Sequence, residues 1–239
     1  MTDERLEAKA YWASLPFASY HQDGPQRRII TDAVRELGRE QPIRSVLEFG
    51  CNVGRTLHVM SKSLVPSPRV AGLDINEAAV EDGRKTYGLD LRTGSEDALA
   101  KLGDDEFDCA FTVSVFDHMA ERTQVRDAIV QLARIAKRYM LLLEPFDGTN
   151  RRALSTETHV QFNYYWNYPD LLREIGIVLL HDLWFPIGYG TPMQPRYRLY
   201  VAAMEPTALG LSAIFVWRTR LERARWMVRN NPTVKRIWQ

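Results

Sequence analysis

Two carboxylates and two glycines are spaced so that together they can bind a nucleoside. Glu48 precedes Gly50 and Gly54 in the run VLEFGCNVG, and Asp74 follows about 20 residues after the turn. Glycine lets the backbone approach a ligand at places where a side chain would intrude. A carboxylate at Glu48 can accept hydrogen bonds from an ammonium group, and one at Asp74 can bind both hydroxyls of a ribose. Two alternatives stay open, namely a glycine turn without a ligand and Asp74 as the N-cap of the next helix.

The spacing of the glycines distinguishes two kinds of nucleotide site. A dinucleotide turn, G-x-G-x-x-G, would need glycine where Asn52 stands. The pattern E-x-G-x-x-x-G of Glu48, Gly50 and Gly54 instead resembles the first motif of the class I S-adenosylmethionine-dependent methyltransferases. The resemblance covers about residues 43 to 204 and includes the phrases FDCAFTVSVFDHM, QLARIAK and LLLEP. KRYMLLLEP replaces the Pro-Gly-Gly turn often found in this family, so the sequence does not distinguish sugar, cell-surface and secondary-metabolite substrates.

The resemblance implies that the cofactor is S-adenosyl-L-methionine, bound by residues at or just after the ends of the first four predicted strands. In TGSEDAL, the serine and the two acids stand where such enzymes hold the adenine amino group, although capping of the following short helix explains the same residues. The residues assigned to the cofactor are Glu48, Gly50, Cys51, Asn52, Gly54, Asp74, Ile75, Ser95, Glu96, Asp97 and Ser114.

Methyl transfer from a sulfonium needs mainly alignment of the acceptor, because the methyl group is already electrophilic. His118 is the best candidate base, since it follows a strand end and imidazole titrates near neutral pH. Asp117 would orient His118 or the substrate, and His159 is a second candidate base. The alternative for His118 is that it caps or packs the following helix. No grouping of residues supplies a convincing set of metal ligands.

A long segment after the fifth predicted strand is expected to form a lid over the acceptor, at about residues 147–168. The run DGTNRRALSTETHVQFNYYWNYPDLL is too long for an ordinary connection. Its arginines can bind a phosphate or carboxylate, and its aromatic residues can shield the sulfonium or stack on a ring. Packing of the same aromatic residues at the sheet edge is the alternative. The predicted substrate residues are Arg151, Arg152, Tyr164, Tyr165 and Trp166.

Short β-branched runs alternate with helix-length stretches and predict the elements that position these residues. We expect an α/β fold with a doubly wound, Rossmann-like, seven-stranded, mainly parallel sheet and helices on both faces. Ligands of such sheets bind at the carboxyl ends of the strands. The strands are predicted at residues 45–50, 69–75, 89–94, 107–115, 139–146, 177–185 and 197–204, and helices at 54–64, 76–87, 96–102 and 122–137.

We expect three parts in the chain: a helical cap at residues 1–40, the sheet domain at 41–205, and a basic amphipathic helix with its tail at 206–239. In the cap, DGPQRRIITDAVREL predicts a packing helix with Asp23 as a candidate N-cap and Pro25 in its first turn. The preceding YWASLPFASYHQ is aromatic and either lies over a cleft or packs in the core.

Composition places the chain among globular, cytoplasmic proteins. It has 239 residues, 45% hydrophobic residues, and 31 Lys and Arg against 30 Asp and Glu, which gives no global case for binding nucleic acid. Its two cysteines, Cys51 and Cys109, show no zinc or disulfide spacing. The charged N-terminus does not resemble a signal peptide, and no apolar run reaches the roughly 18 residues of a membrane span.

The C-terminal stretch from Leu211 carries seven basic residues against one acid, Glu222, and has an apolar stripe at helical spacing. Packing on the domain or in a homodimer is the expected use, membrane contact is a lesser alternative, and nucleic-acid binding ranks last. The predicted function is transfer of a methyl group to a small-molecule acceptor, by in-line O-methylation. The alternatives are an RNA or membrane-lipid-linked substrate, or a catalytically silent scaffold that binds the cofactor.

Overall fold

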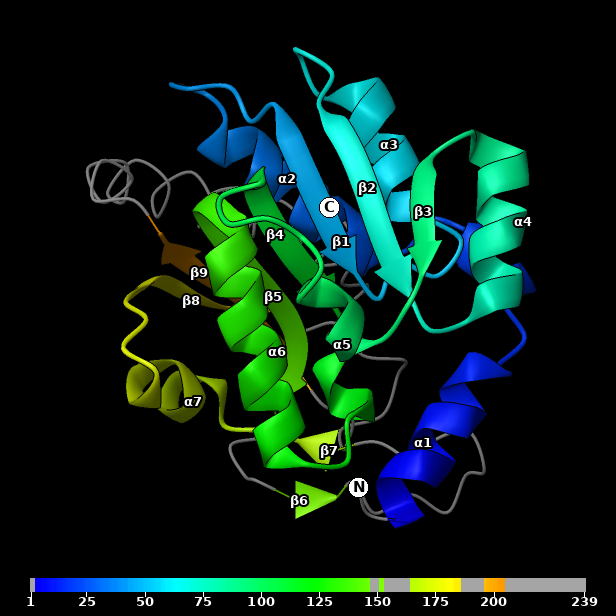
Figure 1. Ribbon diagram of the computed structural model, residues 1–239. Helices are drawn as coiled ribbons and strands as arrows, with labels where there is room; N and C mark the ends of the chain where they lie inside the picture. Colours follow the sequence, from blue (N-terminus) through cyan, green and yellow to red (C-terminus); the bar gives the residue numbers. More distant parts are fainter. Residues whose placement is uncertain (1–2, 147–150, 153–163, 186–195, 205–239) are drawn as a thin grey trace, which may run out of the picture.

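A seven-stranded sheet forms the centre of the molecule. The computed structural model describes residues 3–146, 151–152, 164–185 and 196–204 (Figure 1). The strand order is β3-β2-β1-β4-β5-β9-β8, in which β1 to β5 pair in parallel and β9 runs antiparallel to both β5 and β8. The predicted mainly parallel, Rossmann-like sheet is therefore confirmed. Its strands are β1 (Ser45–Phe49), β2 (Arg69–Asp74), β3 (Asp90–Thr93), β4 (Phe107–Val113), β5 (Ala136–Phe146), β8 (Leu179–Phe185) and β9 (Arg196–Ala203).

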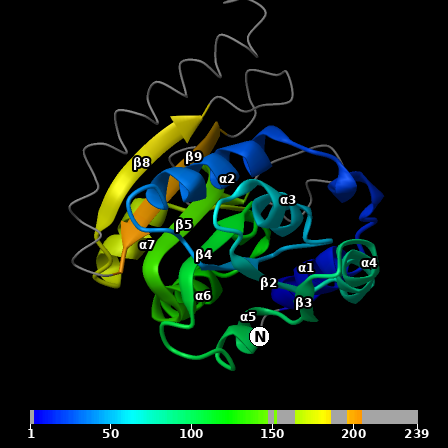
Figure 2. The ribbon, with the colours of Figure 1, turned by 90° about the horizontal axis from the view of Figure 1, so that it is seen from above.

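Helices cover both faces of this sheet, and each face has its own apolar core (Figure 2). Helices α2, α3 and α4 contribute to one core, whereas α5, α6 and α7 contribute to the other, which also includes Ala8 of α1. The helices are α1 (Asp3–Ala13), α2 (Pro25–Leu37), α3 (Arg55–Ser63), α4 (Glu77–Tyr87), α5 (Glu96–Leu99), α6 (Arg122–Ile135) and α7 (Tyr168–Glu174), with short 3-10 helices η1 (Ala18–His21) and η2 (Phe116–His118).

Strand β1 lies in the middle of the sheet, where the strand order reverses. Its residues from Val46 onward are buried, as expected for a parallel strand covered on both faces. Glu48 lies in register with Gly72 of β2 and Phe111 of β4. The segments that follow β1, β2 and β4 therefore meet at one edge of the sheet, which is where ligands of doubly wound sheets bind.

Several elements differ from their predicted bounds. Strand β5 starts at Ala136, directly after α6, and therefore three residues before its predicted start. The N-cap of α2 is Gly24 and not Asp23, whose carboxylate instead accepts a hydrogen bond from Arg55 Nε at 3.0 Å. Two further strands that the sequence did not predict, β6 (Arg151–Arg152) and β7 (Tyr164–Tyr165), pair in antiparallel fashion.

Helix α1 lies beside the carboxyl ends of the parallel strands (Figure 1). Arg5 donates to Glu96 at 2.6 Å, and Lys9 donates to the hydroxyl of Ser95 at 3.1 Å. Just after the helix, the carbonyl of Leu15 accepts from Asn76 Nδ2 at 2.9 Å. These contacts join the N-terminal segment to the loops that follow β2 and β3.

The predicted basic helix at 206–239 lies outside the described residues, and so do any homodimer, membrane or nucleic-acid contacts that it would make. Within the described ranges, no helix is both long and apolar enough to cross a membrane.

Candidate functional site

The glycine turn after β1 uses backbone conformations that glycine adopts easily. Gly50 has φ +80° and Gly54 has φ +73°, and between them Asn52 also has positive φ, at +49°. A Cβ on Gly50 would lie 2.2 Å from Cγ2 of Val115, and one on Gly54 would lie 2.9 Å from Cδ1 of Leu91. The positive φ favours glycine at both positions, and at Gly50 the contact with Val115 excludes a side chain as well, in addition to any approach of a ligand.

A third glycine, which the sequence analysis missed, lets α4 pack closely against the turn. Gly83 lies inside α4, and a Cβ there would approach the carbonyl oxygen of Val53 to 2.2 Å. Glycine in the middle of a helix costs about 1 kcal/mol relative to alanine, so its presence in α4 was a signal of close packing.

Asp74 anchors the glycine turn to the end of β2. Its Oδ2 accepts from the backbone N–H of Asn52 at 2.7 Å, and its Oδ1 accepts from the backbone N–H of Asn76 at 2.8 Å. Burial raises the pKa of Asp74, and backbone N–H groups oppose this shift. The N-cap of α4 is Asn76, whose Oδ1 accepts from Ala79 N at 3.0 Å, so the capping alternative for Asp74 is wrong. Its binding of a ribose stays a prediction.

Glu48 is a buried acid whose second oxygen has no hydrogen-bond partner. The residue is 3% exposed, and Oε2 is the unpartnered atom. Burial raises the pKa of Glu48 to about 8, while the charge of Arg27 and the hydroxyl of Thr56 oppose this shift. Arg27 of α2 is held by the carbonyls of Tyr20, at 2.7 Å, and Gln22. A cationic group of a ligand beside the turn would satisfy the unpartnered oxygen of Glu48.

The thiol of Cys51 lies inside the same turn, where burial raises its pKa well above the usual range. A cysteine in such surroundings is unreactive. Ile75, which follows Asp74, is half-buried. The backbone N–H of Cys51 donates to the carbonyl of Leu73 at 3.0 Å. The assignment of Cys51 and Ile75 to the cofactor stays a prediction.

The residues predicted to hold adenine lie at the start of α5, and some of their side chains already make hydrogen bonds within the protein. Ser95 is the N-cap of α5 but makes no side-chain capping bond, and Glu96 Oε1 accepts from Arg5 and from Gln124 Nε2 at 3.0 Å. Asp97 is exposed. Capping by the Ser95 side chain therefore does not explain these residues, and their contact with adenine stays a prediction.

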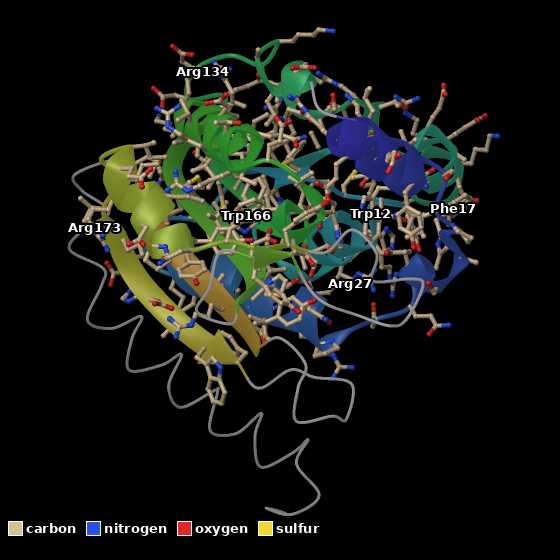
Figure 3. All side chains as sticks on the ribbon, turned by 90° about the horizontal axis from the view of Figure 1, so that it is seen from below. Trp12, Phe17, Arg27, Arg134, Trp166 and Arg173 are labelled. Atoms are coloured by element: carbon tan, nitrogen blue, oxygen red, sulfur yellow. The ribbon has the colours of Figure 1, made fainter. Side chains whose placement is uncertain are left out.

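The end of β4 brings Ser114, Asp117 and His118 to the same edge. Ser114 has φ +52°, and its hydroxyl lies 2.7 Å from the hydroxyl of Tyr197. Asp117 is 4% exposed, and its Oδ1 lies 3.7 Å from Nε2 of His118. The ring of Trp12 packs against that of His118, with centroids 3.5 Å apart and ring planes tilted by 31°. Figure 3 looks onto this edge and labels Trp12, which comes from α1.

Glu144, which lies near the end of β5, is a site residue that the sequence analysis did not identify. It is fully buried, and its Oε1 accepts from the hydroxyl of Thr112 at 2.6 Å. Its Oε2 accepts from the backbone N–H groups of Val115 at 3.0 Å and Phe116 at 3.2 Å. A lone acid in the aliphatic run LLLEP was the sequence signal, because buried carboxylates need dedicated partners. Glu144 therefore holds the turn that carries Asp117 and His118.

The aromatic residues of the predicted lid pack inside the protein. Tyr164, Tyr165 and Trp166 are less than 10% exposed. Trp166 Nε1 donates to the carbonyl of Phe116 at 2.9 Å, and the Tyr164 hydroxyl donates to Glu4 at 2.9 Å. These contacts favour the packing alternative, while a role toward the acceptor stays a prediction.

Other residues of the predicted lid are described only in part. The backbones of Arg151 and Arg152 pair with β7, and His159 lies outside the described residues. Among the described residues, no group of three His, Cys, Asp or Glu is arranged to hold a metal ion.

Comparison with known proteins agrees with the geometry. Residues 46–138 match a family model described as a methyltransferase domain. A 37.1 kDa protein of transposon TN4556 from Streptomyces fradiae, described as uncharacterized, is 31% identical over 101 residues, which are 41% of this chain and 28% of that protein. The chain thus spans less than a third of that relative's length.

Two solved structures share the fold at low sequence identity. Magnesium protoporphyrin IX methyltransferase from Synechocystis PCC 6803, with bound S-adenosylmethionine, is 18% identical, with a TM-score of 0.59 and coverage of 85% of this chain and 98% of that one. Geranyl diphosphate C-methyltransferase from Streptomyces coelicolor is 12% identical, with a TM-score of 0.63 and coverage of 85% and 99%.

Proposed function

We infer that this chain is a class I S-adenosylmethionine-dependent methyltransferase that transfers a methyl group to a small-molecule acceptor, with a hydroxyl oxygen as the methylated atom. The match of residues 46–138 to a methyltransferase-domain model supports this proposal. The observation that carries this proposal is the pair of acids at the tips of the adjacent strands β1 and β2. Glu48 and Asp74 flank a turn whose glycines have positive φ, and Glu48 Oε2 is buried without a partner. A cation and a ribose are the groups that such a site would bind.

The described residues fit the predicted cofactor. Glu48 would hold its ammonium group, Asp74 the ribose hydroxyls, and Ser95, Glu96 and Asp97 the adenine. When bound, S-adenosylmethionine supplies an electrophilic methyl group on a positively charged sulfur. Because this group is already reactive, the protein contributes mainly alignment, which can be worth about 7–11 kcal/mol of the barrier.

The acceptor is expected beside His118, on the side of the site formed by the end of β4. His118 would accept the proton of a hydroxyl acceptor, a contribution of about 10²- to 10⁴-fold in rate. Trp12 packs against its ring, and Asp117 Oδ1 lies 3.7 Å from its Nε2, so both can fix its orientation. In this proposal Ser114, whose hydroxyl is hydrogen-bonded to the hydroxyl of Tyr197, faces the cofactor.

Calorimetry with S-adenosylhomocysteine is the first test, because it needs no knowledge of the acceptor. We expect binding at micromolar to low millimolar ligand, and Asp74→Ala should weaken it at least tenfold. The variant Asp108→Asn is a matched control, since Asp108 accepts from the backbone N–H groups of Arg44 and Ser45 at the opposite end of β4. Absence of binding by the wild type at millimolar ligand would refute the proposal.

Finding the acceptor requires a second experiment. Metabolite profiling of a deletion strain should show a compound that is lighter by one methyl group. Turnover of that compound by the purified protein would distinguish an enzyme from a silent cofactor-binding scaffold. Cofactor binding together with unchanged metabolites would instead favour the scaffold.

A further inference from the structure

Two buried polar atoms next to the proposed base have no hydrogen-bond partner among the described residues. One is Nε1 of Trp12, on α1, and the other is Oδ1 of Asp117, in η2. The ring of Trp12 packs against that of His118 with centroids 3.5 Å apart, and Asp117 Oδ1 lies 3.7 Å from His118 Nε2. The proposed methyl transfer gives a partner to neither atom.

These two atoms need partners of opposite kinds. An indole N–H only donates a hydrogen bond, whereas a carboxylate oxygen only accepts one. The 3.7 Å between Asp117 Oδ1 and His118 Nε2 is too long for a hydrogen bond, so these two side chains do not satisfy each other. Because buried polar groups in proteins are nearly always hydrogen-bonded, an unpartnered donor and an unpartnered acceptor beside one base indicate a ligand group.

A hydroxyl group matches both atoms. Its oxygen accepts from the N–H of Trp12, and its proton is donated to Asp117. A carboxylate or a fully ionised phosphate has no proton to donate to Asp117, and an ammonium group has no lone pair to accept from Trp12.

The charges on α1 also favour a neutral group. Arg5 is paired with Glu96 at 2.6 Å, and Lys9 donates to the hydroxyl of Ser95 at 3.1 Å. These cations are therefore engaged by the start of α5 and its N-cap. An anionic group of the acceptor placed here would be repelled by the carboxylate of Asp117.

Access to the two atoms requires a movement of α1, which lies beside the carboxyl ends of the strands (Figure 1). Trp12 Nε1 and Asp117 Oδ1 have almost no exposed surface. From Glu4 to Ala13, Ala8 is the one buried residue of α1, so the helix is held largely by polar contacts. Elements with few buried apolar contacts open locally at a low cost in free energy. An acceptor can therefore enter when Trp12 moves away from His118.

We propose that Trp12 and Asp117 bind a second hydroxyl group of the acceptor, on the carbon next to the one that bears the methylated oxygen. This inference rests on the proposed function and names its substrate class, a vicinal diol. The first hydroxyl gives its proton to His118, while the second keeps its proton, accepts from Trp12 Nε1 and donates to Asp117 Oδ1. Hydroxyls on neighbouring carbons can reach Asp117 Oδ1 and His118 Nε2 together, because these atoms are 3.7 Å apart.

NMR spectroscopy of protein with nitrogen-15-labelled tryptophan tests this contact without knowledge of the acceptor. The probes are cis-1,2-cyclohexanediol and catechol, each compared with its single-hydroxyl counterpart, cyclohexanol or phenol. The protein is saturated with S-adenosylhomocysteine at pH 8, where Asp117 is mainly ionised, since burial raises its pKa to about 7. The Nε1–H signal of Trp12 is assigned by its absence from Trp12→Phe.

We expect the Trp12 signal to shift with at least one diol, with a dissociation constant at least about tenfold lower than that of its single-hydroxyl counterpart. A response to only one of the two diols would distinguish an alicyclic from an aromatic acceptor. Asp117→Ala should abolish the preference for the diol, whereas Asp108→Asn, at the opposite end of β4, should retain it. The signal of Trp166, whose Nε1 already donates to the carbonyl of Phe116, should not move.

Three outcomes would overturn the proposal: no shift of the Trp12 signal with either diol, equal affinity for each diol and its counterpart, or a preference that persists in Asp117→Ala. If Asp117→Ala does not fold, the comparison of probes on the wild type alone decides. Calorimetry on the same sample measures the binding of S-adenosylhomocysteine. Failure of that binding refutes the proposed function, and the same titration of the protein without this ligand still decides whether Trp12 and Asp117 bind a diol.

Discussion

Binding of S-adenosylhomocysteine is expected to release a proton from Glu48. Without a ligand, the carboxyl is buried and its pKa is about 8, so it is about nine-tenths protonated at pH 7. An ammonium group placed against the unpartnered Oε2 favours the carboxylate and expels this proton. Expected release is therefore about 0.9 proton per ligand at pH 7, about 0.5 at pH 8 and about 0.1 at pH 9.

Affinity should follow the same titration. Deprotonating Glu48 at pH 7 costs about 1.4 kcal/mol, the equivalent of one pH unit below its pKa, so binding at pH 7 is about tenfold weaker than the ionised site allows. Replacing Glu48 by glutamine removes a charge-assisted hydrogen bond worth about 1.5–3 kcal/mol. Glu48→Gln should therefore lose the proton release and bind about 10- to 150-fold more weakly at pH 9, where the wild-type carboxyl is ionised.

Calorimetry in buffers with different ionisation enthalpies measures the proton release directly. The amino group of the ligand also titrates, but this contribution is the same for wild type and Glu48→Gln and cancels in their difference. Asp108→Asn again serves as the control and should release as many protons per ligand as the wild type. If the wild type released less than about 0.2 proton at pH 7, or as much as Glu48→Gln, the proposed contact between Glu48 and the ammonium group would be wrong.

The burial of Glu48 also predicts a pH dependence of stability without any ligand. Because its folded-state pKa lies above the ordinary value of 4.5, its effect on the free energy of unfolding is most favourable below pH 4.5 and declines as the pH rises to about 8. Glu48→Gln lacks this decline. Relative to wild type, we expect it to gain on the order of 2–4 kcal/mol between pH 5 and pH 9 in denaturant titrations, and equal slopes in the two proteins would contradict the pKa.

Three further perturbations follow from the geometry of the turn and of α1. Gly50→Ala should destabilise the protein by at least about 2 kcal/mol in urea unfolding, because its Cβ would meet Val115. The control Gly88→Ala has φ +67° but nothing within 4 Å of its Cβ, so it should cost only about 1–2 kcal/mol. Equal losses in the two variants would argue against the clash. Asp74→Asn can retain only one of the two backbone N–H bonds and should cost about 1–3 kcal/mol, measured in the same way, whereas a neutral result would show that the turn does not depend on this carboxylate. Trp12→Ala removes the ring packed against the proposed base and should lower turnover of an identified acceptor while leaving S-adenosylhomocysteine affinity within about twofold. A large loss of that affinity would place α1 in cofactor binding instead.

The sequence predicted the sheet and the location of the site because both depend on local patterns. Seven apolar runs separated by helix-length stretches were enough to predict the mainly parallel sheet. Acids at the carboxyl ends of two neighbouring strands had to meet at the same edge of it. In contrast, the capping of α2 was predicted wrongly. Asp23 has the right residue type for an N-cap, but its carboxylate pairs with Arg55 of α3, a partner 32 residues away in the chain.

The residues that only the tertiary structure identified are those whose partners lie far away in sequence. Local pattern determined that Glu48, Gly50, Gly54 and Asp74 would surround one turn, since they lie at or just after the ends of strands that pair side by side. Nothing in LLLEP shows that Glu144 would receive N–H groups from a turn 28 residues earlier. Packing also decided that Trp166 would be buried with its Nε1 on the carbonyl of Phe116. The burial and proton affinity of a side chain depend on every element around it, whereas the periodicity of a sequence describes only the strand or helix that contains the residue.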